Sequence, residues 1–148
     1  MCATLDEALR RINAARKSGD ASEERVDGLY GGPSQRLAVY GTLAPGEVNH
    51  HELESVRGTW RTGWVEGHLH AEGWGATDGF PAMVWEPGAP RVPVRVLESA
   101  QLAQHWDRLD AFEGAEYLRV LVPVHGLATA AVVANLYSLR ERVPGRAS

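Results

Sequence analysis

The sequence has very little cysteine. Cys2 is the only cysteine among 148 residues, so an internal disulfide is excluded, and so is a zinc site built from several cysteines. A chain that does not depend on disulfides is typical of a reducing compartment, and we expect a cytoplasmic location. The first residues carry acidic side chains and no apolar stretch of secretory length, so the sequence predicts no signal peptide.

Long hydrophobic runs and an excess of positive charge are also missing. No segment approaches the roughly 20 apolar residues that a membrane-spanning helix needs, so we expect no membrane partner. The formal net charge is -4 and the basic residues are mostly scattered, which gives no support for a nucleic-acid partner. Hydrophobic residues make up 44% of the chain and charged residues 23%, a balance typical of a globular domain with one core.

The chain begins with a helical pattern. Between residues 4 and 18 apolar side chains recur at helical spacing, Thr4 precedes Glu7 as in a capping box, and Gly19 follows. Residues 19–35 are polar and rich in turn formers, which predicts a linker. The apolar stripe predicts packing on the rest of the chain, or on a partner subunit in a homodimer. A solvated, marginal helix is the alternative.

From residue 37 onward, short apolar or alternating runs are separated by glycine and proline. This texture predicts six strands in a compact sheet or barrel. Pro93 lies within one alternating run, which predicts an edge position or a bulge. The spacing of apolar residues predicts one helix over residues 99–112. The predicted strands are 37–40, 59–70, 81–85, 92–97, 118–124 and 129–137, in a domain of residues 36–140 between an N-terminal part (1–35) and a tail (141–148).

The turn after the first predicted strand is a candidate for binding. Residues 37–40 form an apolar run that ends at Gly41. A strand that ends in glycine leaves backbone N–H groups without ladder partners and has no Cβ to keep a ligand away. Such a turn can hold a carboxylate or an oxyanion. An ordinary strand end with a glycine turn would show the same pattern.

Glu113 is the candidate for proton transfer. It ends the helix predicted from residue 99 and is flanked by Phe112 and Tyr117. A carboxyl group beside apolar rings is desolvated, so its pKa rises and it can both take and return a proton. The alternative is a solvated glutamate at a helix end.

Both candidates lie in motifs that resemble those of the gamma-glutamylcyclotransferase-like family, in its gamma-glutamylamine cyclotransferase-type branch. The resemblance covers about residues 37–139. It implies an α+β fold, a small mixed β-barrel with short flanking helices, to which this chain adds its N-terminal helix. The residues that carry it are Val39, Tyr40, Gly41, Thr42, Leu43, Gly46, Asn49 and His50 in the first motif, and Leu109, Asp110, Phe112, Glu113, Gly114, Tyr117 and Arg119 in the second.

The resemblance also implies an activity that needs no cofactor. In that family, the α-amine of a γ-glutamyl group attacks its own γ-carbonyl, which gives 5-oxoproline and a free amine or amino acid. Glu113 would be the catalytic general acid and base, and a small γ-glutamyl compound would be the substrate. The substrate-binding loop would be Tyr40, Gly41, Thr42 and Leu43.

Tyr117 and Arg119 are further candidates for substrate binding. At positions 117 and 119 of a strand, the two side chains face the same side. Tyr117 would then bond Glu113 or the substrate, and Arg119 would pair with a carboxylate. The alternative for Arg119 is a structural ion pair with Asp110.

Three other interpretations stay open from the sequence. His68 and His70, together with Glu113, could hold zinc, but no further ligand follows at a recognisable spacing, and we expect no metal. The chain could be a non-catalytic member of the same fold that binds a small metabolite. It could also be an interaction module in which the N-terminal helix docks a partner.

Overall fold

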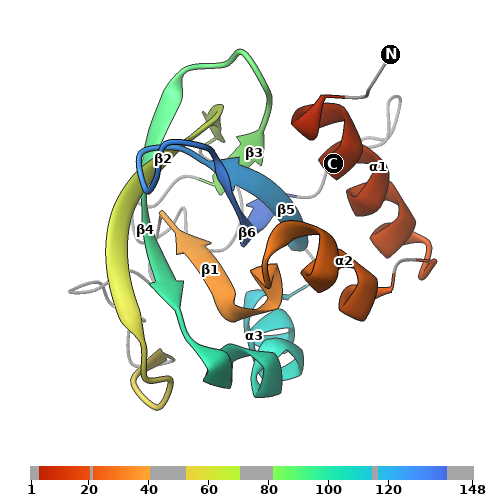
Figure 1. Cartoon of the computed structure of the whole chain (residues 1–148), viewed down its shortest axis with the longest axis vertical. Coiled ribbons are helices and arrows are strands. Elements are labelled where there is room, and N and C mark those ends of the chain that lie inside the picture. Colours follow the sequence, from red (N-terminus) through yellow and green to blue (C-terminus); the bar gives the residue numbers. More distant parts are fainter. Residues whose placement is uncertain (1–3, 21, 41–52, 71–81, 115–116, 140–148) are drawn as a thin grey trace.

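Six strands form one strongly curved, nearly closed sheet with three helices around it (Figure 1). The structure is a computed structural model that describes residues 4–20, 22–40, 53–70, 82–114 and 117–139. The α-helices are α1 (Leu5–Lys17), α2 (Glu23–Tyr30) and α3 (Trp106–Glu113), and the 3-10 helices are η1 (Pro33–Gln35) and η4 (Ala100–Gln104). The strands are β1 (Arg36–Val39), β2 (Thr59–His70), β3 (Ala82–Trp85), β4 (Arg91–Glu98), β5 (Tyr117–Val124) and β6 (Val132–Leu139).

The sheet is mixed, as the predicted α+β barrel requires. Its strand order is β3-β2-β4-β1-β6-β5. Strand β1 is parallel to β6 and antiparallel to β4, and the other neighbouring pairs are antiparallel. The predicted fold class is therefore confirmed. None of the described helices is long and apolar enough to cross a membrane.

A backbone bridge between Trp64 and His125 closes the barrel on one side. The N–H of each residue donates to the carbonyl of the other, both at 2.9 Å. The neighbouring Gly63 allows this approach, because a Cβ at that position would lie 2.7 Å from the His125 carbonyl oxygen and 2.8 Å from a methyl carbon of Val124. A side chain there would force β2 away from the end of β5.

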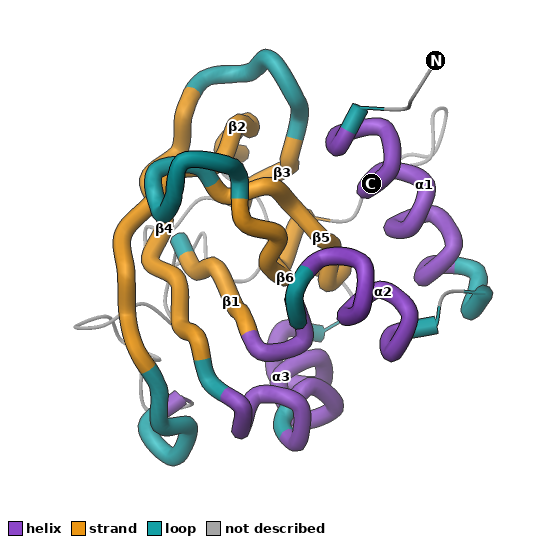
Figure 2. The backbone as a smooth tube through the Cα atoms, in the orientation of Figure 1, coloured by secondary structure: helices purple, strands orange, loops and turns teal. Residues whose placement is uncertain are grey.

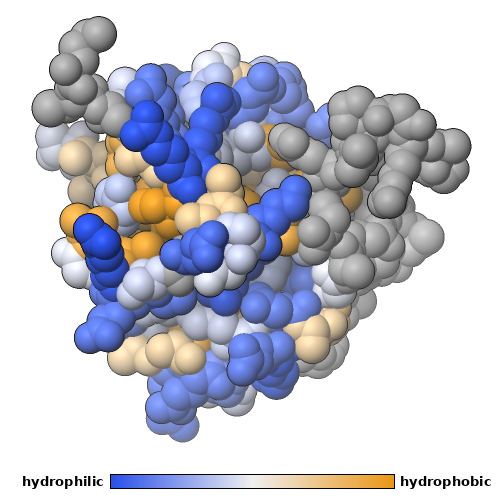
Figure 3. Space-filling view, turned by 90° about the vertical axis from the view of Figure 1, so that its right-hand side faces the viewer, coloured by the Kyte–Doolittle hydropathy of each residue, from blue (hydrophilic) through white to orange (hydrophobic). Residues whose placement is uncertain are grey.

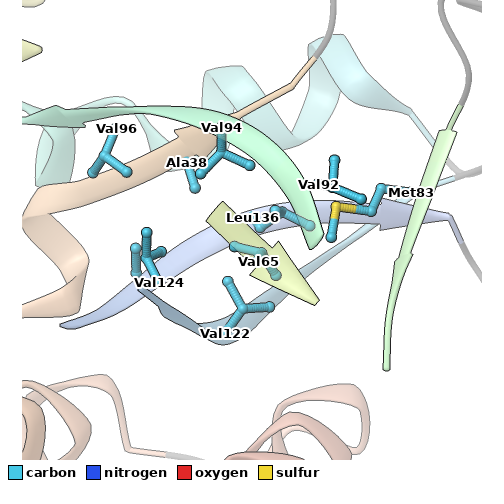
Figure 4. Packing of buried hydrophobic residues seen from close by; sticks show 10 residues of the cluster. Ala38, Val65, Met83, Val92, Val94, Val96, Val122, Val124 and Leu136 are labelled. Atoms are coloured by element: carbon cyan, nitrogen blue, oxygen red, sulfur yellow. The ribbon is translucent and has the colours of Figure 1, made fainter. Parts of the chain in front are cut away.

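The barrel interior is filled by small and medium-sized apolar side chains from several strands (Figure 4). Val92, Val94 and Val96 point inward at alternate positions of β4, which confirms the period read from the sequence. A second apolar cluster lies between α3 and the sheet and includes Leu37, Leu97, Trp106, Leu109 and Tyr137. The two clusters hold the sheet between an inner core and a helix-covered outer core.

Helix α1 packs on the rest of the chain, which is one of the two arrangements that the stripe predicted. Leu9 and the α2 residue Val26 are buried against Leu121 and Val133. The Asn13 side chain also donates to the Leu121 carbonyl at 3.0 Å and accepts from the Leu121 N–H at 2.7 Å. The side-chain amide of Asn13 thus bonds the backbone of the edge strand β5 as a neighbouring strand would. Helices α1 and α2 lie together beside β5 and β6 (Figure 2).

Four sequence predictions need correction. Residues 19–35 are not a plain linker, because they contain α2 and η1, with Ser22 capping α2 at one end and Gly31 ending it at φ 71°. The sequence gives little indication of α2, because this helix has only eight residues and only one of them is buried, so its apolar pattern is short. The helix predicted over 99–112 is divided, with a 3-10 segment before α3.

Pro93 marks neither an edge strand nor a bulge. Strand β4 lies between β2 and β1, and its register with β2 is continuous. Pro93 is tolerated because its partner Trp64 directs its backbone bonds to His125. Within the described residues, the pairing of β4 with β1 ends at Arg95. The last strand also differs from the prediction, since residues 129–131 precede β6 and do not belong to it.

Replacing Gly63 by alanine should destabilise the barrel. The added Cβ meets the backbone carbonyl of His125, so β2 and β5 must separate, and overpacking of this kind typically costs about 1–3 kcal/mol. Urea unfolding of the variant would measure this loss. Gly28→Ala is the matched control, because nothing lies within 4 Å of a Cβ at that helical position. Equal stability of Gly63→Ala and the unmodified chain would contradict the account of the barrel closure.

Candidate active site

Glu113 is the last residue of α3, at a point where the helix packs on the outer face of the sheet. Trp106 and Leu109 anchor the helix in the apolar cluster, and Phe112 and Tyr117 pack against the same cluster on either side of Glu113 in the sequence. Burial raises the pKa of the Glu113 carboxyl from 4.5 to about 7. The expected desolvation is confirmed, and Glu113 is not a solvated glutamate at a helix end.

Gly114 ends the helix directly after this carboxylate. Its φ of 81° lies in a region that favours glycine, and its N–H donates to the Asp110 carbonyl at 3.1 Å. The chain can therefore leave α3 sharply and enter β5 at Tyr117. This turn fixes where the end of α3 stands relative to the sheet.

Tyr40 lies close to Glu113 and is largely enclosed. Its hydroxyl donates to the Tyr137 carbonyl at 2.7 Å and accepts from the Met83 N–H at 3.0 Å. Burial raises the pKa of Tyr40, the Met83 hydrogen bond opposes this rise, and the nearby Tyr117 and Glu113 add to it. The structure thus brings together three of the side chains singled out from the sequence, which are Tyr40, Glu113 and Tyr117.

Arg119 forms the ion pair with Asp110 that was the alternative to substrate binding. Its Nε lies 3.0 Å from Asp110 Oδ1 and its Nη2 lies 3.3 Å from Oδ2. The guanidinium carbon also stands 4.6 Å from the centre of the Trp106 ring. The Arg119 charge is therefore compensated within the protein, and a contact of Arg119 with substrate stays a prediction.

Tyr137 is a residue of this neighbourhood that sequence reasoning did not select. Its hydroxyl donates to Asp110 Oδ1 at 2.6 Å. Burial and the Asp110 carboxylate raise the pKa of Tyr137, and the nearby Glu113 adds to the rise. The signal that could have found it is the pairing of Arg119 with Tyr137 across β5 and β6, which requires the register of the sheet.

A hollow of about 430 Å³ opens beside the end of α3. Asp110 and Gly114 line it on the α3 side, and Tyr117, Arg119 and Tyr137 line it from the sheet. Residues from the C-terminal half of α1 and from the start of α2 also line it. A small molecule in this hollow would lie next to the residues that flank Glu113.

Gly41, Thr42 and Leu43 lie outside the described residues, and so do Gly46, Asn49 and His50. The expected backbone donors of the 41–43 turn therefore remain a prediction.

The histidines considered as zinc ligands have other neighbours. His68 Nε2 lies 2.5 Å from Glu86 Oε2, and the rings of His68 and His70 are 6.5 Å apart. Within the described ranges, no three histidine, cysteine, aspartate or glutamate side chains gather in a way that could hold a metal ion.

Comparisons with known proteins support the fold. Residues 37–147 match the model of a family described as gamma-glutamyl cyclotransferase, AIG2-like. A search of curated proteins found no match.

Three solved structures are similar to the chain. The uncharacterized protein PH0828 from Pyrococcus horikoshii is 26% identical with a TM-score of 0.53, covering 75% of this chain and 82% of that one. YkqA from Bacillus subtilis is 27% identical with a TM-score of 0.54, covering 71% of this chain and 35% of that one. An AIG2-like protein from Mus musculus is 24% identical with a TM-score of 0.57, covering 74% of this chain and 80% of that one, and it supports the fold.

Glu113→Gln should stabilise the folded chain at alkaline pH. Between pH 4.5 and 7 the folded state retains a proton that the unfolded chain has released, so the free energy of unfolding falls as the pH rises through this window. The loss approaches about 3 kcal/mol above pH 7. The neutral amide avoids it, so the variant should be more stable than the unmodified chain at pH 8, and by much less at pH 5.

Urea unfolding at the two pH values measures this difference. Glu24→Gln, which removes an exposed glutamate of α2, is the control for a simple change in net charge. A Glu113→Gln advantage that is the same at pH 5 and pH 8 would show that the carboxyl is not desolvated in solution.

Proposed function

Because the chain belongs to the gamma-glutamyl cyclotransferase, AIG2-like family, we propose that it releases 5-oxoproline from a small γ-glutamyl compound with Glu113 as general acid and base. The observation that carries the proposal is the half-buried carboxyl of Glu113, whose pKa of about 7 lies near neutral pH. A carboxyl with this pKa is present in both protonation states under ordinary conditions, and so it can serve in both directions of proton transfer.

The proton balance of the reaction fits a single carboxylate. The substrate amine arrives as an ammonium with three protons, and the lactam nitrogen of the product keeps one. Glu113 takes one proton, which allows the amine nitrogen to attack the γ-carbonyl carbon and close the five-membered ring. The other proton passes to solvent. Glu113 then gives its proton to the departing nitrogen as the old carbon–nitrogen bond breaks.

No nucleophile from the protein is needed, because both reacting groups belong to one glutamyl unit. The protein has to hold that unit in its folded-back conformation, and orientation of this kind is a large source of rate enhancement. Tyr40 and Tyr117, which lie near Glu113, are suited to form walls around the glutamyl group. The Tyr40 hydroxyl already donates to the Tyr137 carbonyl and accepts from the Met83 N–H, so we assign its ring, and not its hydroxyl group, to contact with the substrate.

The developing negative charge on the γ-carbonyl oxygen requires donors. We assign this part to the backbone N–H groups of residues 41–43, which follow Tyr40 directly. The support is the glycine at position 41 and the match of this segment to the family. A donor that is aimed at such an oxyanion typically contributes about 3–4 kcal/mol.

The proposal predicts that the purified protein forms 5-oxoproline from at least one member of a panel of γ-glutamyl amines, amino acids and peptides. Glu113→Gln should lower kcat by about 10²–10⁴-fold, because an amide cannot carry the proton. Product analysis by mass spectrometry measures both. Glu24→Gln is the control and should keep full activity. A folded protein that forms no 5-oxoproline from the whole panel would favour a non-catalytic metabolite-binding role instead.

The pH dependence of the reaction gives a separate prediction. The pKa of Glu113 in the free protein is about 7, so kcat/KM should decrease towards low pH with a midpoint near that value. Carbon-13 NMR of labelled glutamate side chains would locate the Glu113 titration directly. A Glu113 midpoint close to 4.5, or a rate profile unrelated to the measured midpoint, would remove Glu113 from the proton-transfer role.

A further inference from the structure

Helix α1 forms one wall of the hollow that is also lined by Asp110 and Gly114 near the end of α3. It lies outside the part of the chain that matches the family, which begins at residue 37. The wall is firmly attached. Asn13 bonds both backbone groups of Leu121, and Arg16 Nη1 donates to Asn135 Oδ1 at 2.7 Å. The far side of the hollow is therefore built by residues that this chain adds to the family domain.

The charges that line the hollow are almost balanced in pairs. Arg16 holds Glu23 through two contacts, at 3.0 and 2.5 Å, and Arg119 holds Asp110. The remaining charged side chain on the wall is Lys17. Lys17 is exposed, and no ion-pair partner for it occurs in the part of the chain that the structure describes. Among the described residues that line the hollow, Lys17 therefore adds one positive charge that no ion pair balances.

This charge lines the same hollow as residues on either side of Glu113, although Glu113 itself is not among the lining residues. Asp110 lies one turn before Glu113 and Gly114 directly after it, and both face the same hollow as Lys17. A γ-glutamyl group that reacts at Glu113 would leave its other half to occupy neighbouring space. The face of the molecule that carries α1 shows hydrophilic side chains beside apolar patches (Figure 3), which suits a leaving group with both a polar and an aliphatic part.

We infer that this hollow receives the leaving group of the substrate, and that Lys17 selects a leaving group that bears a carboxylate, as in a γ-glutamyl amino acid or peptide. The inference rests on the proposed function and narrows its substrate class. A polyamine or other cationic leaving group would meet Lys17 as a like charge. A neutral amine would gain nothing from it. The aliphatic part of the leaving group would lie against Leu118, Val120 and the Tyr117 ring.

The test compares two compounds that differ only at the leaving carboxylate, γ-glutamyl-alanine and γ-glutamyl-alanine amide. The unmodified protein should have a kcat/KM about twofold to fivefold higher for the acid, the size expected of an exposed ion pair. Lys17→Gln should abolish the preference, and Lys17→Glu should reverse it. Added salt should reduce the preference in the unmodified protein, since the lysine is exposed to solvent.

Arg11→Gln is the matched control, because it also removes one exposed cation from α1 and Arg11 does not line the hollow. It should keep the preference. The inference is overturned if the unmodified protein turns over both compounds equally, if it favours the amide, or if Lys17→Gln and Arg11→Gln behave alike.

Failure of the proposed function can be told apart from failure of the inference. If neither compound yields 5-oxoproline, calorimetry of the two compounds with the unmodified protein and with Lys17→Gln still measures recognition of the carboxylate. Tighter binding of the acid that depends on Lys17 would support the hollow as a carboxylate site in a non-catalytic protein. Equal binding of the acid and the amide would overturn it.

Discussion

The hydroxyl group of Tyr40 joins two strands that the sheet order keeps apart. It donates to a carbonyl of β6 and accepts from an N–H of β3, although these strands are not neighbours in the sheet. Each of those backbone groups would cost about 1–3 kcal/mol if it were buried without a partner. Tyr40 therefore holds the end of the barrel together at the point where β1 leads into the family's first motif. Tyr40 is thus both a residue of the candidate active site and a structural link between β3 and β6.

Tyr137 extends this set of hydrogen bonds from Tyr40 to α3. Its carbonyl accepts from Tyr40, and its hydroxyl donates to Asp110, which also pairs with Arg119. A connected set of hydrogen bonds thus runs from β3 through the barrel wall to the helix that ends in Glu113. Networks of this kind restrict the side chains that they join, and a catalytic group needs such support from the residues behind it. The end of α3 is fixed by side-chain bonds as well as by apolar packing.

Local signals in the sequence predicted the elements better than their arrangement. The alternation of Val92, Val94 and Val96 and the cap at Thr4 are set by residues within a few positions, and both are present in the structure. The aromatic neighbours of Glu113 were enough to predict a desolvated carboxyl. Helix α2 was missed because eight residues with one buried side chain give too weak a period.

The contacts that complete the site come from distant parts of the chain. Asn13 recognises the edge of β5 over a separation of 108 residues, and the pairing of Tyr137 with Arg119 depends on the register of two strands. Neither is encoded in a local pattern. The hollow beside Glu113 exists because α1, from outside the family domain, lies against β5. The family motifs, which begin after residue 37, identify Glu113 but not the contribution of α1 to the hollow.

Asp110 and Glu113 lie one turn apart on α3, but their carboxylates have different surroundings and different roles. Asp110 receives a guanidinium and a phenol, so its oxygens are occupied and its charge is compensated. Glu113 stands among partly buried aromatic rings, where desolvation raises its pKa to about 7. The first arrangement suits an anchor, and the second suits a group that exchanges protons near neutral pH. If the two carboxylates exchanged environments, α3 would lose the contacts of Asp110 with Arg119 and Tyr137, and the site would lose its desolvated acid. The order of Asp110 and Glu113 along α3 therefore matters both for the stability of the fold and for the proposed chemistry.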